Sequence, residues 1–312
     1  MLLDILKILL FPGFAFLAAY AFLLEYVDRK AYARMQNRVG PPWYQPLADF
    51  FKLLGKKVII PRNAGKRTFA ALPVVSLAAV ATAYVSVPVW GRAAIVGYEG
   101  DLVVVLYLLS IPTICLFLAG FSSHDVYTIM GAFRTLTQMF AYEVPLFIAF
   151  LSPAVLAGTW SITGILAFYA GRPLLALVNL PAFFIALLSA QSKLERAPFD
   201  APEAETEIVG GALVEYGVRY LAFMHASAMC ELAVVTSAIA ALFLPVLTGF
   251  AAADFALYLI KTLALLLLLT LLRASVARIR MDQMLNFCWM VMTPMAIIQI
   301  VVNLFLRGGL GL

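Results

Sequence analysis

Residues 191–216 read QSKLERAPFDAPEAETEIVGGALVEY and separate two long apolar runs of a chain in which 64% of the residues are hydrophobic. The segment carries six carboxylates: Glu195, Asp200, Glu203, Glu205, Glu207 and Glu215. An ionised carboxylate close to a lipid bilayer is costly unless it is solvated, paired or neutralised by a proton. Acidic clusters between membrane helices are typical of proton or cation handling, so this segment is where the sequence predicts function.

The composition places the whole chain in a membrane. Only 12% of the 312 residues are charged, against about a quarter in soluble proteins, and the mean hydropathy is +0.97. A spanning helix needs about 20 mostly apolar residues. The sequence predicts an all-α integral membrane protein with one membrane domain over residues 1–312 and eight spans, at about 2–26, 69–90, 102–122, 139–158, 174–191, 218–245, 254–273 and 285–306.

The basic residues predict the orientation of these spans. Eight spans place both termini on one side, and 17 of the 22 Lys and Arg residues fall in the loops on the other side. Ten of them lie between Asp28 and Arg67. Because cytoplasmic loops carry an excess of Lys and Arg, we expect the functional loops 28–67 and 192–217 to be cytoplasmic, with external termini, in a cell membrane.

The first of these loops also predicts a helix on the membrane surface. Apolar residues recur at helical spacing and charged residues occupy the opposite face. They are Leu47, Phe50, Phe51 and Leu54 against Asp49, Lys52 and Lys56. The preceding segment GPPWYQP, residues 40–46, cannot be regular helix because proline restricts its neighbours.

The loop carboxylates allow two interpretations. Glu203 and Glu207 are four residues apart and share a face if the segment is helical, so their charges would push one another toward protonation. A proton relay requires that property. A solvated loop whose acids pair with basic neighbours is an equal alternative, with Lys193, Arg196 and Arg219 as the partners.

Two further acids fall inside predicted spans. Glu143 and Glu231 are candidates for ion coupling, because intramembrane acids are functional candidates by default. A structural hydrogen bond or salt bridge to a neighbouring helix is the alternative for each. Lys261, the one base expected deep in a span, is a third candidate, and either acid could be its partner.

The sequence contains no pattern for covalent chemistry. Cys115, Cys230 and Cys288 are isolated in apolar runs, and no metal-ligand spacing, phosphate-binding loop or nucleophile triad is present. We therefore expect no catalytic residue, no metal and no cofactor bound by this chain, so that any redox centre belongs to a partner. The clustering of basic residues follows topology and does not indicate nucleic acid.

Three motifs resemble a known family. They are DRKAYARMQNRVGPPWYQPLADFFKLLGKK (28–57), GAFRTLTQMFAYEVPL (131–146) and ERAPFDAPEAETEIVGGALVEY (195–216). They resemble the eight-span membrane subunit that joins the peripheral and membrane arms of respiratory complex I and of energy-converting membrane-bound NiFe hydrogenases. The short GPPWYQP stands where complex I members carry a longer GPNxVGxxGxLQP insert. It is most similar to the hydrogenase branch and puts a quinone site in doubt.

The resemblance implies roles for individual residues. Glu203, Glu205, Glu207 and Glu215 would form an acidic funnel below a partner's iron–sulfur cluster, continued into the membrane by Glu143 and Glu231. Arg34, Arg38 and Asp49 would hold the peripheral arm, and Arg196 and Asp200 would fix the loop through an ion pair.

The resemblance also implies a function in an assembly. The chain would anchor and couple a redox-driven complex that moves protons or sodium ions. Its expected partners are an iron–sulfur small subunit, a NiFe-type large subunit and antiporter-like membrane subunits. The alternatives are a quinone-reducing complex I subunit, a sulfur-reductase subunit, a stand-alone ion-coupled transporter and a purely structural anchor.

Overall fold

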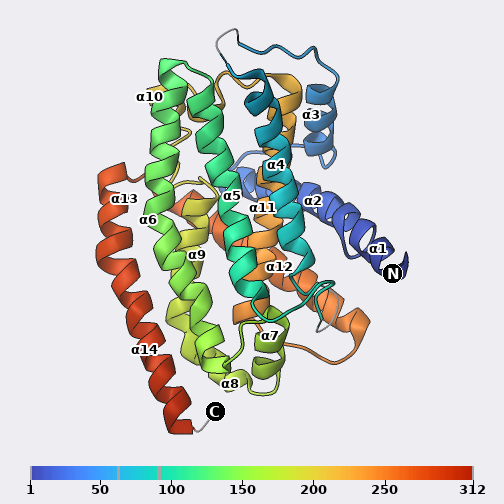
Figure 1. Cartoon of the computed structure of the whole chain (residues 1–312), viewed down its shortest axis with the longest axis vertical. Helices are drawn as coiled ribbons and strands as arrows, with labels where there is room; N and C mark the ends of the chain where they lie inside the picture. Colours follow the sequence, from blue (N-terminus) through green and yellow to red (C-terminus); the bar gives the residue numbers. More distant parts are fainter. Residues whose placement is uncertain (1, 62–63, 90–92, 311–312) are drawn as a thin grey trace.

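The computed structural model describes residues 2–61, 64–89 and 93–310, without the side chains of residues 2–4, 205, 206 and 310. Over these residues the protein is a bundle of helices without strands (Figure 1), and eight stretches are long and apolar enough to cross a membrane. They are Ile5–Met35, Lys66–Val85, Asp101–Ser122, Val126–Ala157, Pro173–Lys193, Val218–Phe243, Ala251–Ser275 and Met281–Gly309. The predicted all-α membrane fold is confirmed.

The chain forms these stretches from α1 (Leu2–Leu9) with α2 (Phe14–Met35), α4 (Lys66–Val85), α5 (Asp101–Ser122), α6 (Val126–Ala157), α8 (Pro173–Ala176) with α9 (Leu180–Lys193), α11 (Val218–Phe243), α12 (Ala251–Ser275), and α13 (Met281–Phe287) with α14 (Thr293–Leu310). A π-helical turn, Cys288–Met292, joins α13 to α14. The shorter helices α3 (Gln45–Leu54), α7 (Ile162–Ala170) and α10 (Glu205–Ile208) lie in the connections.

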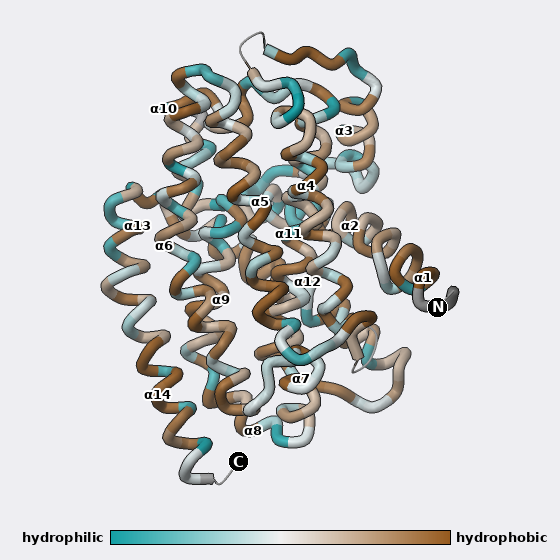
Figure 2. The backbone as a smooth tube through the Cα atoms, viewed as in Figure 1, coloured by the Kyte–Doolittle hydropathy of each residue, from teal (hydrophilic) through white to brown (hydrophobic). Residues whose placement is uncertain are grey.

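Helix α11 forms the centre of the bundle. In its apolar stretch 94% of the residues are buried, compared with 28% in the α13–α14 stretch and 22% in the first one. Its small residues, such as Ala233 and Ala238, let neighbouring helices approach closely, and both are buried. The outer helices therefore present apolar side chains to lipid or to partners, and Figure 2 shows the hydrophobic band that they form.

Two helices extend beyond the predicted spans. The first continues to Met35 instead of ending near residue 26, and α6 begins at Val126 instead of near residue 139. The prediction follows the apolar run, which ends when charged residues begin. In the structure the charges at the end of α2 have partners, as when Arg29 Nε donates to Glu25 Oε1 at 2.6 Å, so the helix continues.

The predicted surface helix is α3. Phe50 packs edge to face against Phe22 of α2, with ring centroids 5.6 Å apart, while Phe51 is 64% exposed. Asp49 Oδ2 lies 3.2 Å from Arg29 Nη1, which ties α3 to the end of α2. The apolar side of α3 thus faces both the bundle and the membrane edge.

The acidic loop between α9 and α11 folds back onto the bundle. Gln138 of α6 donates from Nε2 to the carbonyl oxygens of Ser192 and Phe199, at 2.7 and 2.8 Å. Glycine makes the close approach possible, since a Cβ on Gly131 would lie 2.6 Å from the Cα atom of Gly211. The loop is therefore a packed part of the protein.

Candidate functional site

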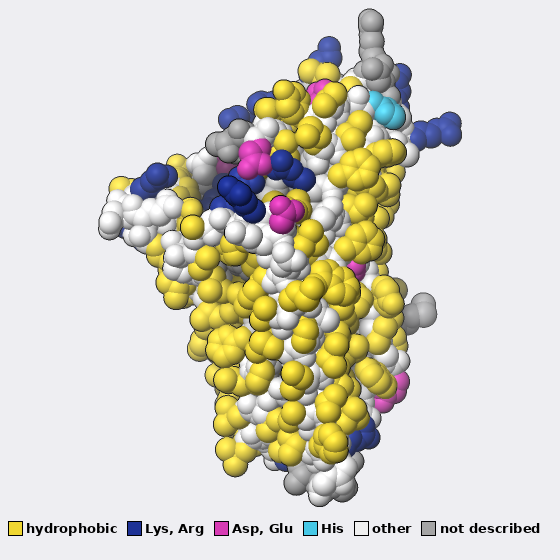
Figure 3. Space-filling view, turned by 90° about the vertical axis from the view of Figure 1, so that its left-hand side faces the viewer, with side chains coloured by type: hydrophobic (Ala, Val, Ile, Leu, Met, Phe, Trp, Pro, Cys, Tyr) yellow, Lys and Arg dark blue, Asp and Glu magenta, His cyan; other side chains and the backbone are white. Residues whose placement is uncertain are grey.

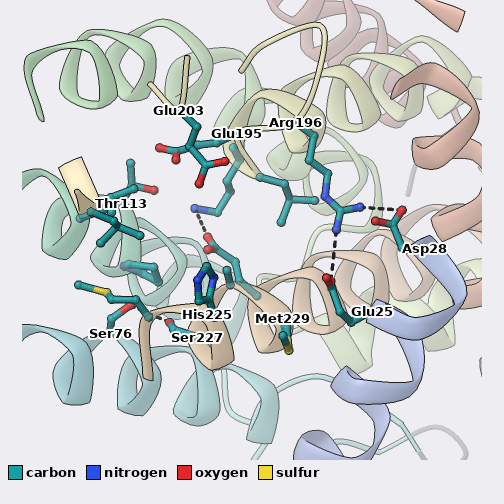
Figure 4. Close-up of a pocket in the computed structure, with 18 of the residues that line it drawn as sticks. Glu25, Asp28, Ser76, Thr113, Glu195, Arg196, Glu203, His225, Ser227 and Met229 are labelled. Atoms are coloured by element: carbon teal, nitrogen blue, oxygen red, sulfur yellow. Dashed lines mark hydrogen bonds and ion pairs between the residues drawn. The ribbon is translucent and has the colours of Figure 1, made fainter. Parts of the chain in front are cut away.

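A polar cavity of about 230 Å³ lies where this loop meets α2, α4, α5, α9, α11 and α12 (Figure 4). Its lining includes five carboxylates and four cations, which are Glu25, Asp28, Glu195, Glu203 and Glu231 with Arg29, Lys193, Arg196 and Arg273. Ser76, Ser227 and His225 add polar groups from α4 and α11. Such a concentration of charge inside a membrane bundle marks this cavity as the candidate site.

A buried ion pair forms the deepest charged contact of the cavity. Lys193 Nζ lies 2.8 Å from Glu231 Oε1, and the two side chains are only 2% and 9% exposed. The same Nζ donates to the carbonyl oxygen of Leu109 and lies 5.7 Å from the centroid of the Tyr142 ring. Because two charges are removed from water here, each depends on the other for compensation.

Glu143 lies beside this pair. It accepts a hydrogen bond from Ser110 Oγ of α5 and is close enough to Lys193 to interact with its charge. The lysine therefore stands between an acid of α11 and an acid of α6. The contact to a neighbouring helix that was the alternative for each acid is present for both Glu143 and Glu231.

Two carboxylates of the acidic loop also line the cavity, Glu195 and Glu203. Glu195, directly after α9, and Glu203 point toward one another in Figure 4. Burial raises the pKa of Glu195 well above its ordinary value, the charges of Glu203 and Glu231 raise that pKa further, and Lys193 opposes them. The predicted repulsion between Glu203 and Glu207 is not found, and the acid that the charge of Glu203 affects is Glu195.

Arg196 joins the acidic loop to α2. Its Nη1 lies 3.1 Å from Asp28 Oδ1 and its Nη2 lies 3.8 Å from Glu25 Oε2. Asp28, only 1% exposed, also accepts a hydrogen bond from Thr270 at 2.6 Å and lies 3.3 Å from Arg273 Nη1. Three segments distant in sequence therefore meet at one carboxylate.

The predicted pairings of the loop are corrected by these contacts. Arg196 and Asp200 do not pair with each other, because Asp200 Oδ1 lies 3.1 Å from Arg278 Nε. Lys193 and Arg196 pair with helix acids, and Arg219 donates to the carbonyl oxygen of Leu54 at 3.0 Å. The ion pairs that the structure describes for Lys193 and Arg196 are thus with acids of α11 and α2, and Arg219 bonds to a backbone carbonyl.

Glu207 lies outside the cavity. Its carboxylate contacts Arg134 Nη1 at 2.6 Å and Arg278 Nη1 at 3.5 Å. The hydrogen bond and charge of Arg134 lower the pKa of Glu207, which is the opposite of the predicted upward shift. Glu215 does not line the cavity, and the side chain of Glu205 falls outside the described part of the chain.

Lys261 is also separate from the site. Its Nζ donates to the carbonyl oxygen of Val246 at 2.6 Å, and it lines a small pocket with Asp254 and Tyr258. The predicted pairing with Glu143 or Glu231 is wrong, because Lys193 occupies that place. The deeply buried base is thus Lys193, which the sequence places in the loop.

Sequence reasoning gave no site role to the cavity residues Glu25, Asp28 and His225, and it considered Lys193 only as a partner of the loop acids. A signal existed for the first two, since acids three residues apart at the end of an apolar run share one helical face. Arg34 and Arg38 lie exposed at and after the end of α2, and Asp49 pairs with Arg29. None of these three residues lines the cavity.

Comparisons with known proteins give one consistent result. The family model for NADH dehydrogenase matches residues 6–304. The H-type subunit of NADH-quinone oxidoreductase from Frankia casuarinae is 34% identical, over 91% of this chain and 69% of that protein. The same type of subunit from Thermomicrobium roseum is 32% identical, over 92% of both chains. A chain in the solved structure of an archaeal membrane-bound sulfane sulfur reductase superposes with a TM-score of 0.85, at 28% identity, over 97% of this chain and 98% of that one.

Proposed function

The chain belongs to the NADH dehydrogenase family, and we propose that, as the membrane subunit of this type in a complex-I-like assembly, it couples electron transfer in partner subunits to movement of protons or sodium ions. The observation that carries this proposal is the cavity in which Glu195 and Glu203 face the buried pair of Lys193 and Glu231.

Coupling would begin with a change of charge near the acidic loop. An electron arriving on a partner close to this loop raises the proton affinity of nearby carboxylates, because negative charge favours their neutral form. Glu195 is suited to respond, since burial and the neighbouring acids already raise its pKa. Proton uptake at its carboxylate removes one negative charge from the lining.

The buried pair would carry this change inward. Lys193 interacts with both Glu231 and Glu143, so the charge of the cavity lining sets how its positive charge is shared between them. When the ammonium group of Lys193 interacts more strongly with Glu143, its attraction to Glu231 becomes weaker. The proton affinity of both acids then changes. Glu143 lies on α6, from which it would pass the change onward to a neighbouring membrane subunit.

The electron carriers belong to partners in this proposal. They are iron–sulfur clusters of a small subunit that ends near the loop, and a large subunit at which the terminal acceptor is reduced. The short segment 40–46 supports the hydrogenase and sulfur-reductase branch over a quinone-reducing enzyme. The positive-inside pattern supports placing the acidic loop and α3 on the cytoplasmic side.

The test is Glu143→Gln in the assembled complex, reconstituted in vesicles. Removing the ionisable group should lower the number of ions moved per electron pair, while electron transfer in detergent continues. Glu99→Gln, which changes an exposed acid in the loop before α5, is the matched control. A wild-type ratio of ions to electrons in Glu143→Gln would remove Glu143 from the pathway.

A further inference from the structure

A second cavity lies on another face of the protein and takes no part in the proposed coupling. It has a volume of about 560 Å³ and lies between α6, the acidic loop and the segment that joins α12 to α13. Its lining combines arginine with apolar side chains, and the residues that decide its chemistry are Arg134, Arg278, Arg280, Glu207, Phe133 and Met281. Figure 3 shows basic and acidic side chains gathered above a broad hydrophobic belt on this face.

The charges that line this cavity are not balanced. Arg134 pairs with Glu207, and Arg278 contacts both Glu207 and Asp200. Arg280 is exposed and forms no ion pair with any side chain that the structure describes. The lining itself thus holds three guanidinium groups and one carboxylate, which leaves it with an excess of positive charge. Guanidinium groups match the oxygen geometry of phosphate especially well.

The apolar part of the cavity places it at the edge of the membrane. Phe133 is 51% exposed on α6, and its ring packs against Phe117 and Phe121 of α5, with centroids 6.1 and 6.5 Å away. Phe140, two turns farther along α6, is 58% exposed. Exposed phenylalanine rings directly beside a cluster of arginines indicate a place where apolar surface meets charged groups. An occupant must therefore match arginine on one side and hydrocarbon on the other.

We propose that this cavity binds the phosphodiester headgroup of an anionic phospholipid, with the acyl chains lying along the exposed face of α6. Basic pockets between membrane helices on the side of the basic loops bind such headgroups. The lipid would connect α6 to the α12–α13 segment, whose Ile279 N–H already donates to the carbonyl oxygen of Pro198 at 3.0 Å. It would therefore brace the acidic loop from its outer side.

Lipid retention by the whole complex tests this site. The complex is placed in nanodiscs of phosphatidylcholine with increasing phosphatidylglycerol, and native mass spectrometry counts the anionic lipids that stay bound. Arg280→Gln should weaken retention of one phosphatidylglycerol about tenfold, because a charge-assisted hydrogen bond is lost. The matched control is Arg67→Gln, which removes another exposed arginine of the basic loops. Equal retention by wild type and Arg280→Gln would overturn the proposal.

The identity of the occupant is tested by cross-linking. Met281 is replaced by the photoreactive benzoylphenylalanine, which samples whatever occupies the cavity in the assembled complex. A covalent adduct with phospholipid supports the proposal. An adduct with a partner polypeptide overturns it in favour of a protein contact. Loss of the bound phosphatidylglycerol on addition of millimolar inorganic phosphate would also overturn it, in favour of a site for free phosphate.

Discussion

Lys193 at the end of α9 and Glu231 in the middle of α11 form an ion pair with an Nζ to Oε1 distance of 2.8 Å and almost no solvent exposure. Glu231 lies thirteen residues into its helix, roughly 20 Å from the start of α11 at a rise of about 1.5 Å per residue. The acidic loop therefore descends into the bundle before α11 begins. This descent creates the cavity and buries the lysine.

Removing one partner of this pair should destabilise the protein far more than removing both. Lys193→Met leaves Glu231 uncompensated, and the cost of an unpaired buried charge is about 3–5 kcal/mol. The double variant Lys193→Met with Glu231→Gln removes both charges and should recover much of that loss. Thermal denaturation of the purified complex compares Lys193→Met, Glu231→Gln and the double variant with wild type. Additive losses in the double variant would mean that the two residues do not act as a pair.

Glu195 should make the stability of the complex depend on pH. Its folded-state pKa is raised above the ordinary value of about 4.3, so the folded state holds a proton that the unfolded state has lost. Stability therefore decreases as pH rises from the ordinary pKa through the raised one, and Glu195→Gln should remove this decrease.

The measurement is the melting temperature of wild type and Glu195→Gln between pH 4 and pH 8. The curves should coincide at the acid end and separate as pH rises, with the variant the more stable. A parallel offset at all pH values would contradict the prediction, because it would indicate a packing effect without titration.

The bundle was predictable because the bilayer imposes its own length scale. About 20 apolar residues are needed to cross it, and the eight runs of this chain meet that requirement in plain sequence. Helix α3 was equally predictable from the sequence, since its apolar side chains recur at helical spacing before Gly55. The C-terminal end of α2 could not be predicted from the sequence. Its charged residues stay in a helix because they contact residues distant in sequence, which are Asp49, Arg196 and Arg273.

The site was predictable only in its residue types. Glu143, Glu203 and Glu231 were identified because acids among apolar runs are costly. Their partners depend on contacts between residues far apart in sequence, such as the 38 positions between Lys193 and Glu231. Sequence placed Lys193 in solvent because a lysine at the end of an apolar run usually reaches water. The descent of the loop reverses that expectation.

Glu207→Gln should leave ion coupling at the wild-type ratio. Glu207 is exposed and held by Arg134 and Arg278 outside the acidic cavity. Its lowered pKa means that the pair stabilises the fold above the ordinary pKa of about 4.3 and loses this effect as pH falls through the lowered value. At neutral pH the substitution therefore changes stability slightly and pumping not at all. Vesicle assays with Lys261→Gln in parallel check this, since Lys261 also lies away from the cavity. Loss of pumping in Glu207→Gln would return it to the pathway.

Arg196→Lys should loosen the acidic loop although it keeps the positive charge. The guanidinium contacts Asp28 and Glu25 through different nitrogens, and a single ammonium group cannot reproduce that geometry. Asp28 keeps Arg273 and Thr270, so one mostly buried ion pair is weakened, at a cost of about 1–3 kcal/mol. Hydrogen exchange of the amides in residues 194–204 should accelerate by about 5- to 100-fold where opening of the loop limits exchange. Arg219→Lys, which changes an arginine bound to the Leu54 carbonyl, should leave these amides unaffected. Unchanged exchange in Arg196→Lys would mean that packing against Gln138 alone holds the loop.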